Sequence, residues 1–271
     1  MSIKQFLDRL SDGFGSNGYG MAFRALLFVW VVLLLCGYVF IATDLLPERF
    51  SWTASIILFL STAVVLLSEA RVRSVRRNVV LALVLFAGAC IVEYIGIRTG
   101  LPFGAYTYTD ALGFRLVGVP VAIAAAWYTT IMITRTIARA VFPPGIATAL
   151  AAGILTLAFD IALEPMASYI ESYWQWTEGR IPLQNYASWF VLSASAVFLL
   201  ERYDPLPAAI PTRAVLKTSL LVFLLQFGLF LIADSLFKYA SHVVIAMLVV
   251  GMTAILWRLR HHTMMHREIS L

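Results

Sequence analysis

The chain has 271 residues, of which 61% are hydrophobic and 13% are charged, and its mean hydropathy is +0.86. Soluble domains are about 45–50% apolar and about 25% charged, so this composition excludes a soluble globular protein and indicates an integral membrane protein. The formal net charge of +5 does not indicate a nucleic-acid partner, because the cytoplasmic loops of membrane proteins are enriched in Lys and Arg, which anionic lipid attracts.

Eight apolar runs approach the length of about 20 residues that a bilayer-crossing helix needs. They lie at about 22–43, 51–68, 79–97, 116–134, 145–164, 187–201, 214–233 and 241–257. The runs are too long and continuous for the alternating strands of a membrane barrel. The sequence therefore predicts an all-α fold, a polytopic transmembrane helical bundle of about eight helices, in a single membrane domain over residues 1–271. The polar arm before the first run has no cleavage motif, so that run is expected to be an uncleaved anchor.

The distribution of Lys and Arg predicts the orientation of the bundle. All but five of these residues lie in the N-terminal arm, in alternate loops or after the last run; the exceptions are Arg49, Arg98, Arg115, Arg180 and Lys238. Because basic residues mark the cytoplasmic side, we expect both termini in the cytoplasm and a multi-pass protein of a cell membrane, the inner membrane of a prokaryote. Cys36 and Cys90 lie inside apolar runs and are expected to be free thiols.

Three acids lie near the predicted outer ends of two apolar runs. Glu93 is near the end of the third run, and Asp160 and Glu164 are near the end of the fifth. A charge at the centre of a bilayer helix costs about 2.5–3.5 kcal/mol on insertion scales, so acids in such runs usually have a function. Asp160 and Glu164 are four residues apart and share one helix face, where two charges repel unless one acid keeps its proton. Pro165 is expected to end or kink this helix.

Two interpretations of these acids remain open from geometry alone. In one, the acids meet in a buried cluster that does acid and base chemistry. In the other, they cap helices or form interfacial salt bridges with Arg98, Arg115 or Arg180.

Aromatic residues surround the acids in the two loops predicted on the same outer side, at about 98–115 and 165–186. An aromatic belt at the headgroup level accounts for most of them. Their concentration also suits a site that holds a long apolar polyene and tolerates a transient cation, because ring faces stabilise positive charge. The residues of this set that we expect to bind substrate are Tyr106, Tyr108, Trp127, Trp174, Trp176 and Trp189.

The ordered motifs of residues 85–200 resemble a known family. They run from Glu93 through GIRTGLPFGAYTY and GVP to Trp127, then D-x-x-x-E-P at 160–165, YWQW at 173–176 and P-x-x-N-x-x-x-W at 182–189. This order resembles the integral-membrane carotenoid biosynthesis hydratases, a group that includes carotenoid 1'-hydratases and bisanhydrobacterioruberin hydratase. The segments outside this core match that group only in hydropathy.

The resemblance implies addition of water to the terminal C1=C2 double bond of an acyclic carotenoid end group, which gives a tertiary alcohol without a cofactor or a metal. Carotenoid, membrane lipid and water are then the expected partners. The acids of the family correspond to Glu93, Asp160 and Glu164, and its polar motif residues correspond to Tyr106, Tyr108 and Asn185.

The chemistry of hydration fits these residue types independently. Protonating the alkene needs a positioned acid, the resulting cation needs a tolerant wall, and the water needs a base or an anchor. We expect Glu93 or one of the pair Asp160 and Glu164 to be the acid, with an ionised neighbour positioning the water. Asn185, Tyr106 and Tyr108 are expected to support these acids as hydrogen-bond donors.

An oxygen-dependent di-iron hydroxylase needs many His ligands, and the chain has only four His, so this function is disfavoured. Two other functions remain as alternatives. An acid-initiated cyclase would use the same cation to close a ring. A transporter or lipid-binding protein would use the acids as proton carriers and would need a polar path toward the cytoplasm, but the cytoplasmic halves of the third to sixth predicted helices carry few acids.

Overall fold

In a computed structural model, the chain is described at residues 18–43, 52–204, 213–237 and 239–251. The long elements of these residues are α-helices: α2 (Gly18–Thr43), α3 (Thr53–Glu69), α4 (Val75–Thr99), α5 (Val121–Arg139), α6 (Ile146–Pro165), α7 (Leu183–Tyr203) and α8 (Arg213–Leu236), followed by the shorter helix Ala240–Gly251. Six of them, all except α3 and the last, are long and apolar enough to cross a membrane. The predicted all-α bundle and its eight helices are confirmed. The orientation of the termini stays a prediction, and many of the basic residues behind it, such as Lys4 and Arg258, lie outside the described residues.

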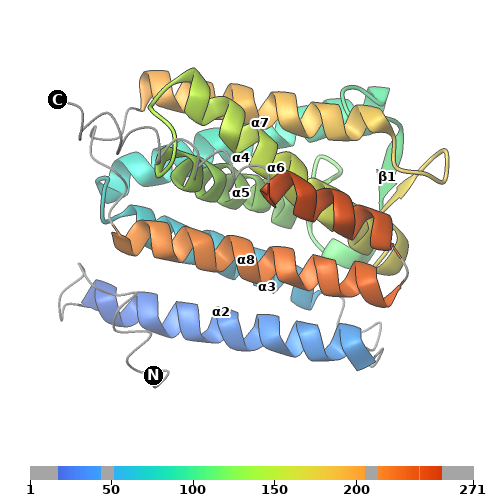
Figure 1. The fold of residues 1–271 in the computed structure, drawn as a ribbon, viewed down its shortest axis with the longest axis horizontal. Helices are drawn as coiled ribbons and strands as arrows, with labels where there is room; N and C mark the ends of the chain where they lie inside the picture. The colour runs from blue at the N-terminus through green and yellow to red at the C-terminus, as the bar shows by residue number, and fades with distance from the viewer. Residues whose placement is uncertain (1–17, 44–51, 205–212, 238, 252–271) are drawn as a thin grey trace, which may run out of the picture.

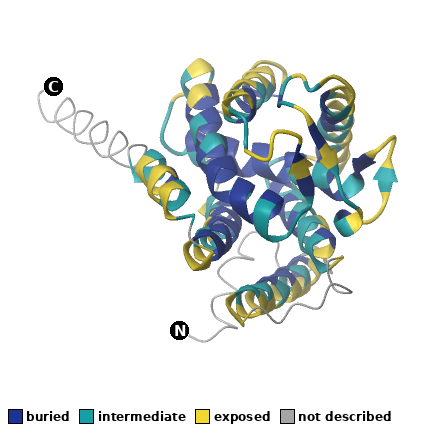
Figure 2. Ribbon diagram, turned by 90° about the vertical axis from the view of Figure 1, so that its right-hand side faces the viewer, coloured by how far each residue is buried: buried dark blue, intermediate teal, exposed yellow. Residues whose placement is uncertain are grey.

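The helices run side by side along one direction (Figure 1). α5 lies at the centre, because it packs against α3, α4, α6 and α8. α2 lies at the edge of the bundle and packs against α3 and α8 only through its inner face (Figure 2). α6 and α7 pack closely where Gly153 faces Phe190, since a Cβ at Gly153 would lie 3.1 Å from the Phe190 carbonyl oxygen.

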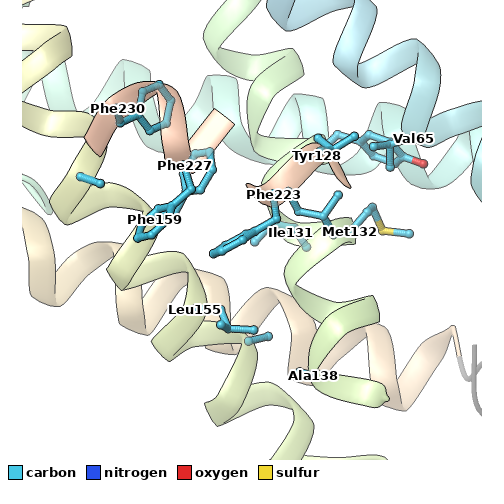
Figure 3. Close-up of a cluster of buried hydrophobic side chains, with 14 of the residues drawn as sticks. Val65, Tyr128, Ile131, Met132, Ala138, Leu155, Phe159, Phe223, Phe227 and Phe230 are labelled. Atoms are coloured by element: carbon cyan, nitrogen blue, oxygen red, sulfur yellow. The ribbon is translucent and has the colours of Figure 1, made fainter. Parts of the chain in front are cut away.

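The apolar core lies where α5, α6 and α8 meet (Figure 3). Phe159 of α6 contacts Phe223 and Phe230 of α8, with ring centroids 5.6 and 5.1 Å apart. Phe223 stacks on Phe227 at 5.4 Å. These contacts fix α8 against α6, the helix that carries Asp160 and Glu164.

Two short β-ladders lie at the end of the bundle where Figure 1 labels β1. The α4–α5 connection contains β1 (Tyr106–Tyr108), a 3₁₀ turn (Asp110–Leu112), β2 (Arg115–Leu116) and β3 (Val119–Pro120), and the α6–α7 connection contains β4 (Trp174–Trp176). β2 pairs with β3, and β1 pairs antiparallel with β4. The sequence did not predict these ladders, since segments of two or three residues are too short to show a period.

The ends of α4 and α6 determine where their acids lie. α4 ends at Thr99 and is capped by Gly100, which has a left-handed backbone (φ 74°) and whose N–H donates to the Gly96 carbonyl. α6 ends its α-helical turns at Pro165, as predicted, and continues as one π-helical turn, Met166–Ile170. Proline has no N–H to continue the α-helical ladder, which accounts for the change of helix type.

The opposite end of the bundle holds a network of buried ion pairs. Arg135 of α5 donates to Glu201 and to Asp204 at 2.8 and 3.2 Å. The other pairs are Arg73 with Glu69 and Asp204, Arg139 with Glu201, and the half-exposed Arg77 with Asp204. These acids are paired with arginines on neighbouring elements, so they close this end of the bundle as a structural network.

Candidate active site

Glu93, Asp160 and Glu164 come together at the end of the bundle that carries β1 and β4. Their side chains are buried, with 3%, 2% and 1% of each residue exposed. All three line one cavity of about 200 Å³. α4 supplies the first acid and α6 supplies the other two, so the acids meet between these helices, and side chains of α2, α3, α5, α7 and α8 also line the cavity.

Glu93 accepts hydrogen bonds from three neutral donors. The hydroxyls of Tyr106 and Tyr108 donate to its Oε2 atom at 2.5 and 2.8 Å. The indole Nε1 of Trp127 donates to its Oε1 atom at 3.0 Å. Both oxygens of this carboxylate are therefore held in fixed positions.

Glu164 is held in the same way by a different set of donors. The indoles of Trp174 and Trp176 donate to its Oε2 atom at 3.3 and 3.0 Å. The amide of Asn185 donates to its Oε1 atom at 2.9 Å. Glu164 thus also has partners on both oxygens.

The register of the β1–β4 ladder divides four of these donors between the two acids. Tyr106 pairs with Trp176, and Tyr108 pairs with Trp174. Alternate residues of a strand point to the same face, so all four rings lie on one face of the ladder. The tyrosines of β1 reach Glu93 and the tryptophans of β4 reach Glu164. The rings also contact across the ladder, with centroids 5.3 Å apart for Tyr106 and Trp176.

Asp160 is hydrogen-bonded less completely than its two neighbours. The Asn185 amide donates to its Oδ2 atom at 3.0 Å, while its buried Oδ1 atom has no hydrogen-bond partner. One –NH₂ group carries two hydrogens, so Asn185 bridges Asp160 and Glu164. A buried polar atom without a partner is costly, which makes the Oδ1 atom of Asp160 the exceptional atom of the site.

Stacked aromatic rings form another wall of the cavity. Trp127 stacks on Trp189 with ring centroids 4.5 Å apart and planes 27° apart. Phe103 contacts both rings at 6.4 and 6.2 Å. Tyr94, in contrast, is 38% exposed and does not line the cavity.

Tyr106 and Tyr108 remain protonated donors at neutral pH. Burial raises the pKa of each phenol above its ordinary value of 10.0, and the nearby Glu93 charge raises each pKa further. Each hydroxyl therefore keeps the proton that it donates to Glu93.

The interfacial salt-bridge interpretation is wrong for these acids. Arg115 pairs with Asp110, Arg180 pairs with Glu178, and Arg98 lies over the Tyr94 ring. In the part of the chain that the structure describes, no three His, Cys, Asp or Glu side chains are grouped to hold a metal ion.

Sequence reasoning missed two polar residues at this end of the molecule, Gln226 and Asp234. Gln226 of α8 lines the cavity. Asp234 of α8 is fully buried and has no partner on either carboxylate oxygen, and the Tyr186 hydroxyl is also buried without a partner. A polar residue in or next to an apolar run was the available signal for Gln226 and Asp234, but neither belongs to a recognised motif.

The chain is similar in sequence to known proteins. A family model described as "Carotenoid biosynthesis protein" matches residues 53–253. Bisanhydrobacterioruberin hydratase of Haloarcula japonica is a distant relative, with 29% identity over 118 residues. That alignment covers 41% of this chain and 40% of the hydratase, less than half of either protein. No solved structure matches the chain.

Proposed function

Because this chain belongs to the carotenoid biosynthesis protein family, we propose that it adds water to the terminal C1=C2 double bond of an acyclic carotenoid end group. The product is a tertiary alcohol. The observation that carries this proposal is the group of three buried carboxyls in an aromatic cavity, where one carboxyl oxygen has no partner. The similarity to a hydratase supports the choice of water as the second reactant.

Asp160 is the acid in this proposal. Its Oδ1 atom is the one carboxyl oxygen among the three acids without a protein partner, so it is free to carry a proton toward substrate. Glu93 and Glu164 each accept three hydrogen bonds, the arrangement that suits an ionised carboxylate. Asn185 holds Asp160 beside Glu164 by donating to the Oδ2 atom of Asp160. The proton of Asp160 is therefore carried by its Oδ1 atom, which has no protein partner.

The first step moves a proton and creates a cation. The π electrons of the alkene take the proton from Asp160 Oδ1 at C2, and C1 becomes a tertiary carbocation. The rings of Trp127, Trp189 and Trp176 surround the cavity, and their faces stabilise positive charge. The carboxylates of Glu93 and Glu164 add electrostatic stabilisation at fixed positions.

The second step adds water. A water molecule held by Glu93 attacks C1, forms the C–O bond and releases a proton to this carboxylate. That proton returns to Asp160 through solvent, so the sum is alkene plus water to alcohol, and no cofactor is consumed. The tyrosines keep Glu93 in place as the water-holding base.

The membrane provides the setting for this reaction. Carotenoids dissolve in lipid, and six helices among the described residues are long and apolar enough to cross a bilayer. We place the protein in a cell membrane, the inner membrane of a prokaryote, with the acids near the outer leaflet and a short path for water.

Expression in a host that accumulates lycopene tests the proposal. A pigment heavier by one water is the expected result. A pigment of unchanged mass but altered absorption would mean that the cation closes a ring, and unaltered lycopene together with detectable folded protein would count against both reactions on this substrate.

A further inference from the structure

The cavity that holds the three carboxyls continues away from them toward α2. Its far end is bordered by Cys36, Gly37 and Phe40 of α2 and by Ile57 of α3. Cys36 is exposed, and Phe40 is 40% exposed on the outside of the bundle. Because the same side chains border both the cavity and the outer surface, the cavity reaches the surface of the molecule beside α2.

The surface around this opening is apolar. The α2 span has a mean hydropathy of 2.7, and its exposed side chains include Val32, Leu35 and Val39. α2 lies at the edge of the bundle, and none of the other described helices covers its outer face (Figure 2). A surface of this kind in a membrane-spanning helix contacts lipid chains, so the opening faces the hydrocarbon of the bilayer.

Tyr38 closes the boundary between α2 and α8. Its hydroxyl donates to the Leu225 carbonyl at 2.5 Å. Gly228 allows this close approach, because a Cβ there would lie 2.9 Å from the hydroxyl oxygen. This contact leaves the boundary between α2 and α3, where Cys36, Gly37 and Ile57 line the cavity, as the side for an opening.

The size of the cavity limits what it encloses. A volume of about 200 Å³ is below the 300–1,000 Å³ of pockets that enclose a drug-sized ligand. A long polyene fits only by one end, and the remainder of its chain must leave through an opening.

We propose that the site takes a long isoprenoid polyene end-first from the lipid, through an opening between α2 and α3 beside Cys36 and Phe40. The rest of the polyene stays in the bilayer against α2. The nature of the ligand rests on the proposed function, whereas the position of the opening rests on the cavity and the exposure of α2.

The two cysteines of the chain provide a direct probe. Cys36 borders the opening, and Cys90 of α4 does not line the cavity. The purified protein in lipid nanodiscs is treated with a membrane-permeant maleimide, with and without lycopene. At about ten times its Kd, lycopene should slow alkylation of Cys36 about tenfold by mass action and leave Cys90 unaffected. Equal alkylation of Cys36 with and without lycopene would overturn the proposal.

Substitutions at the opening give an independent readout. Gly37 lines the cavity, and no atom lies within 4 Å of the position that a Cβ would take there, so Gly37→Trp places a large ring in the passage. Val39 is 59% exposed and does not line the cavity, so Val39→Trp is the matched control. Loss of lycopene protection in G37W but not in V39W is expected, and equal protection in both variants would contradict the opening.

These measurements distinguish failure of the proposed opening from failure of the proposed hydration. Protection of Cys36 without any product would reject hydration and retain the opening. Product formation without protection of Cys36 would retain hydration and reject the opening.

Discussion

Asp160, Glu164 and Glu93 differ in how their oxygens are bonded, and this difference assigns their proposed roles. Glu93 and Glu164 have donors on both oxygens, while Asp160 shares one donor, Asn185, with its neighbour. The same chemical group therefore lies in two environments within one cavity. Unequal environments of neighbouring carboxyls are the usual basis for dividing acid and base roles.

Asp160→Asn should lower turnover about 10²–10⁴-fold, the usual contribution of a positioned acid. The amide keeps the shape and the contact with Asn185 but cannot deliver a carboxyl proton. Turnover of lycopene by purified protein at equal folded amounts is the measurement. Asp234→Asn is the matched control, because Asp234 is buried and unpartnered but does not line the cavity. Full activity of D160N would remove Asp160 from the acid role.

The raised pKa of Tyr106 predicts that the folded protein loses stability at alkaline pH. Burial and Glu93 raise the pKa of this phenol above 10.0 in the folded state, so above pH 10 the unfolded chain loses a proton that the folded chain keeps. Unfolding then releases a proton, and the free energy of unfolding falls as pH rises. Between about pH 9 and 11, the melting temperature of the detergent-solubilised wild type should fall. The fall should be smaller in Tyr106→Phe. Identical curves would show that this phenol does not contribute.

Among the elements, α4 and the β1–β4 ladder set the geometry of the site together. α4 brings Glu93 to the cavity, and the ladder brings its tyrosine donors from one connection and the tryptophan donors of Glu164 from another. The ladder fits against α4 because Gly96 leaves space for the Tyr106 ring. A Cβ at Gly96 would lie 2.9 Å from the Tyr106 hydroxyl oxygen.

Gly96→Ala should displace the Tyr106 hydroxyl from Glu93 and lower turnover. A hydrogen bond to a charged group contributes about 1.5–3 kcal/mol, which corresponds to about a tenfold to hundredfold loss if it acts in the transition state. Gly88→Ala, on the same helix with no atom within 4 Å of the added Cβ, is the control and should keep wild-type activity. Equal turnover by the two variants would mean that the Tyr106 hydroxyl tolerates the added Cβ at residue 96, which would contradict this prediction.

The two ends of the whole molecule use their acids differently. One end neutralises acids with arginines across α3, α5 and α7, and the other end surrounds its acids with neutral donors. The first arrangement holds helices together, and the second leaves carboxyl groups available for chemistry. Removing a charge should therefore affect stability at the first end and turnover at the second.

Arg135→Leu should destabilise the folded protein strongly. The residue is fully buried, and its loss leaves Glu201 and Asp204 with fewer partners. Breaking a buried pair in this way typically costs about 3–5 kcal/mol. Thermal unfolding in detergent measures the effect, and Arg180→Ala, in a pair that is 80% exposed at Arg180, should stay within about 1 kcal/mol of the wild type. A similar melting temperature for both variants would contradict the structural role of the network.

Local patterns in the sequence predicted the helices and indicated three acids as candidate site residues. Apolar length gave eight helices, and the motif order brought Glu93, Asp160 and Glu164 into one hypothesis. The pairing of Tyr106 with Trp176 was not predictable, because it joins two short segments that are distant in the chain. Arg135 and Asp204 were likewise separated in sequence, so counting acids by helix could not show that they are paired.

Isotope incorporation by the purified protein tests the central claim most directly. The protein is incubated with lycopene in deuterated water, and separately in ¹⁸O-labelled water, and the products are extracted into ordinary solvent before mass analysis. The proposed mechanism predicts one non-exchangeable deuterium on carbon and one ¹⁸O atom from water for each end group that reacts. An alcohol whose oxygen comes from dioxygen, or one formed without deuterium on carbon, would contradict protonation of the alkene followed by addition of water.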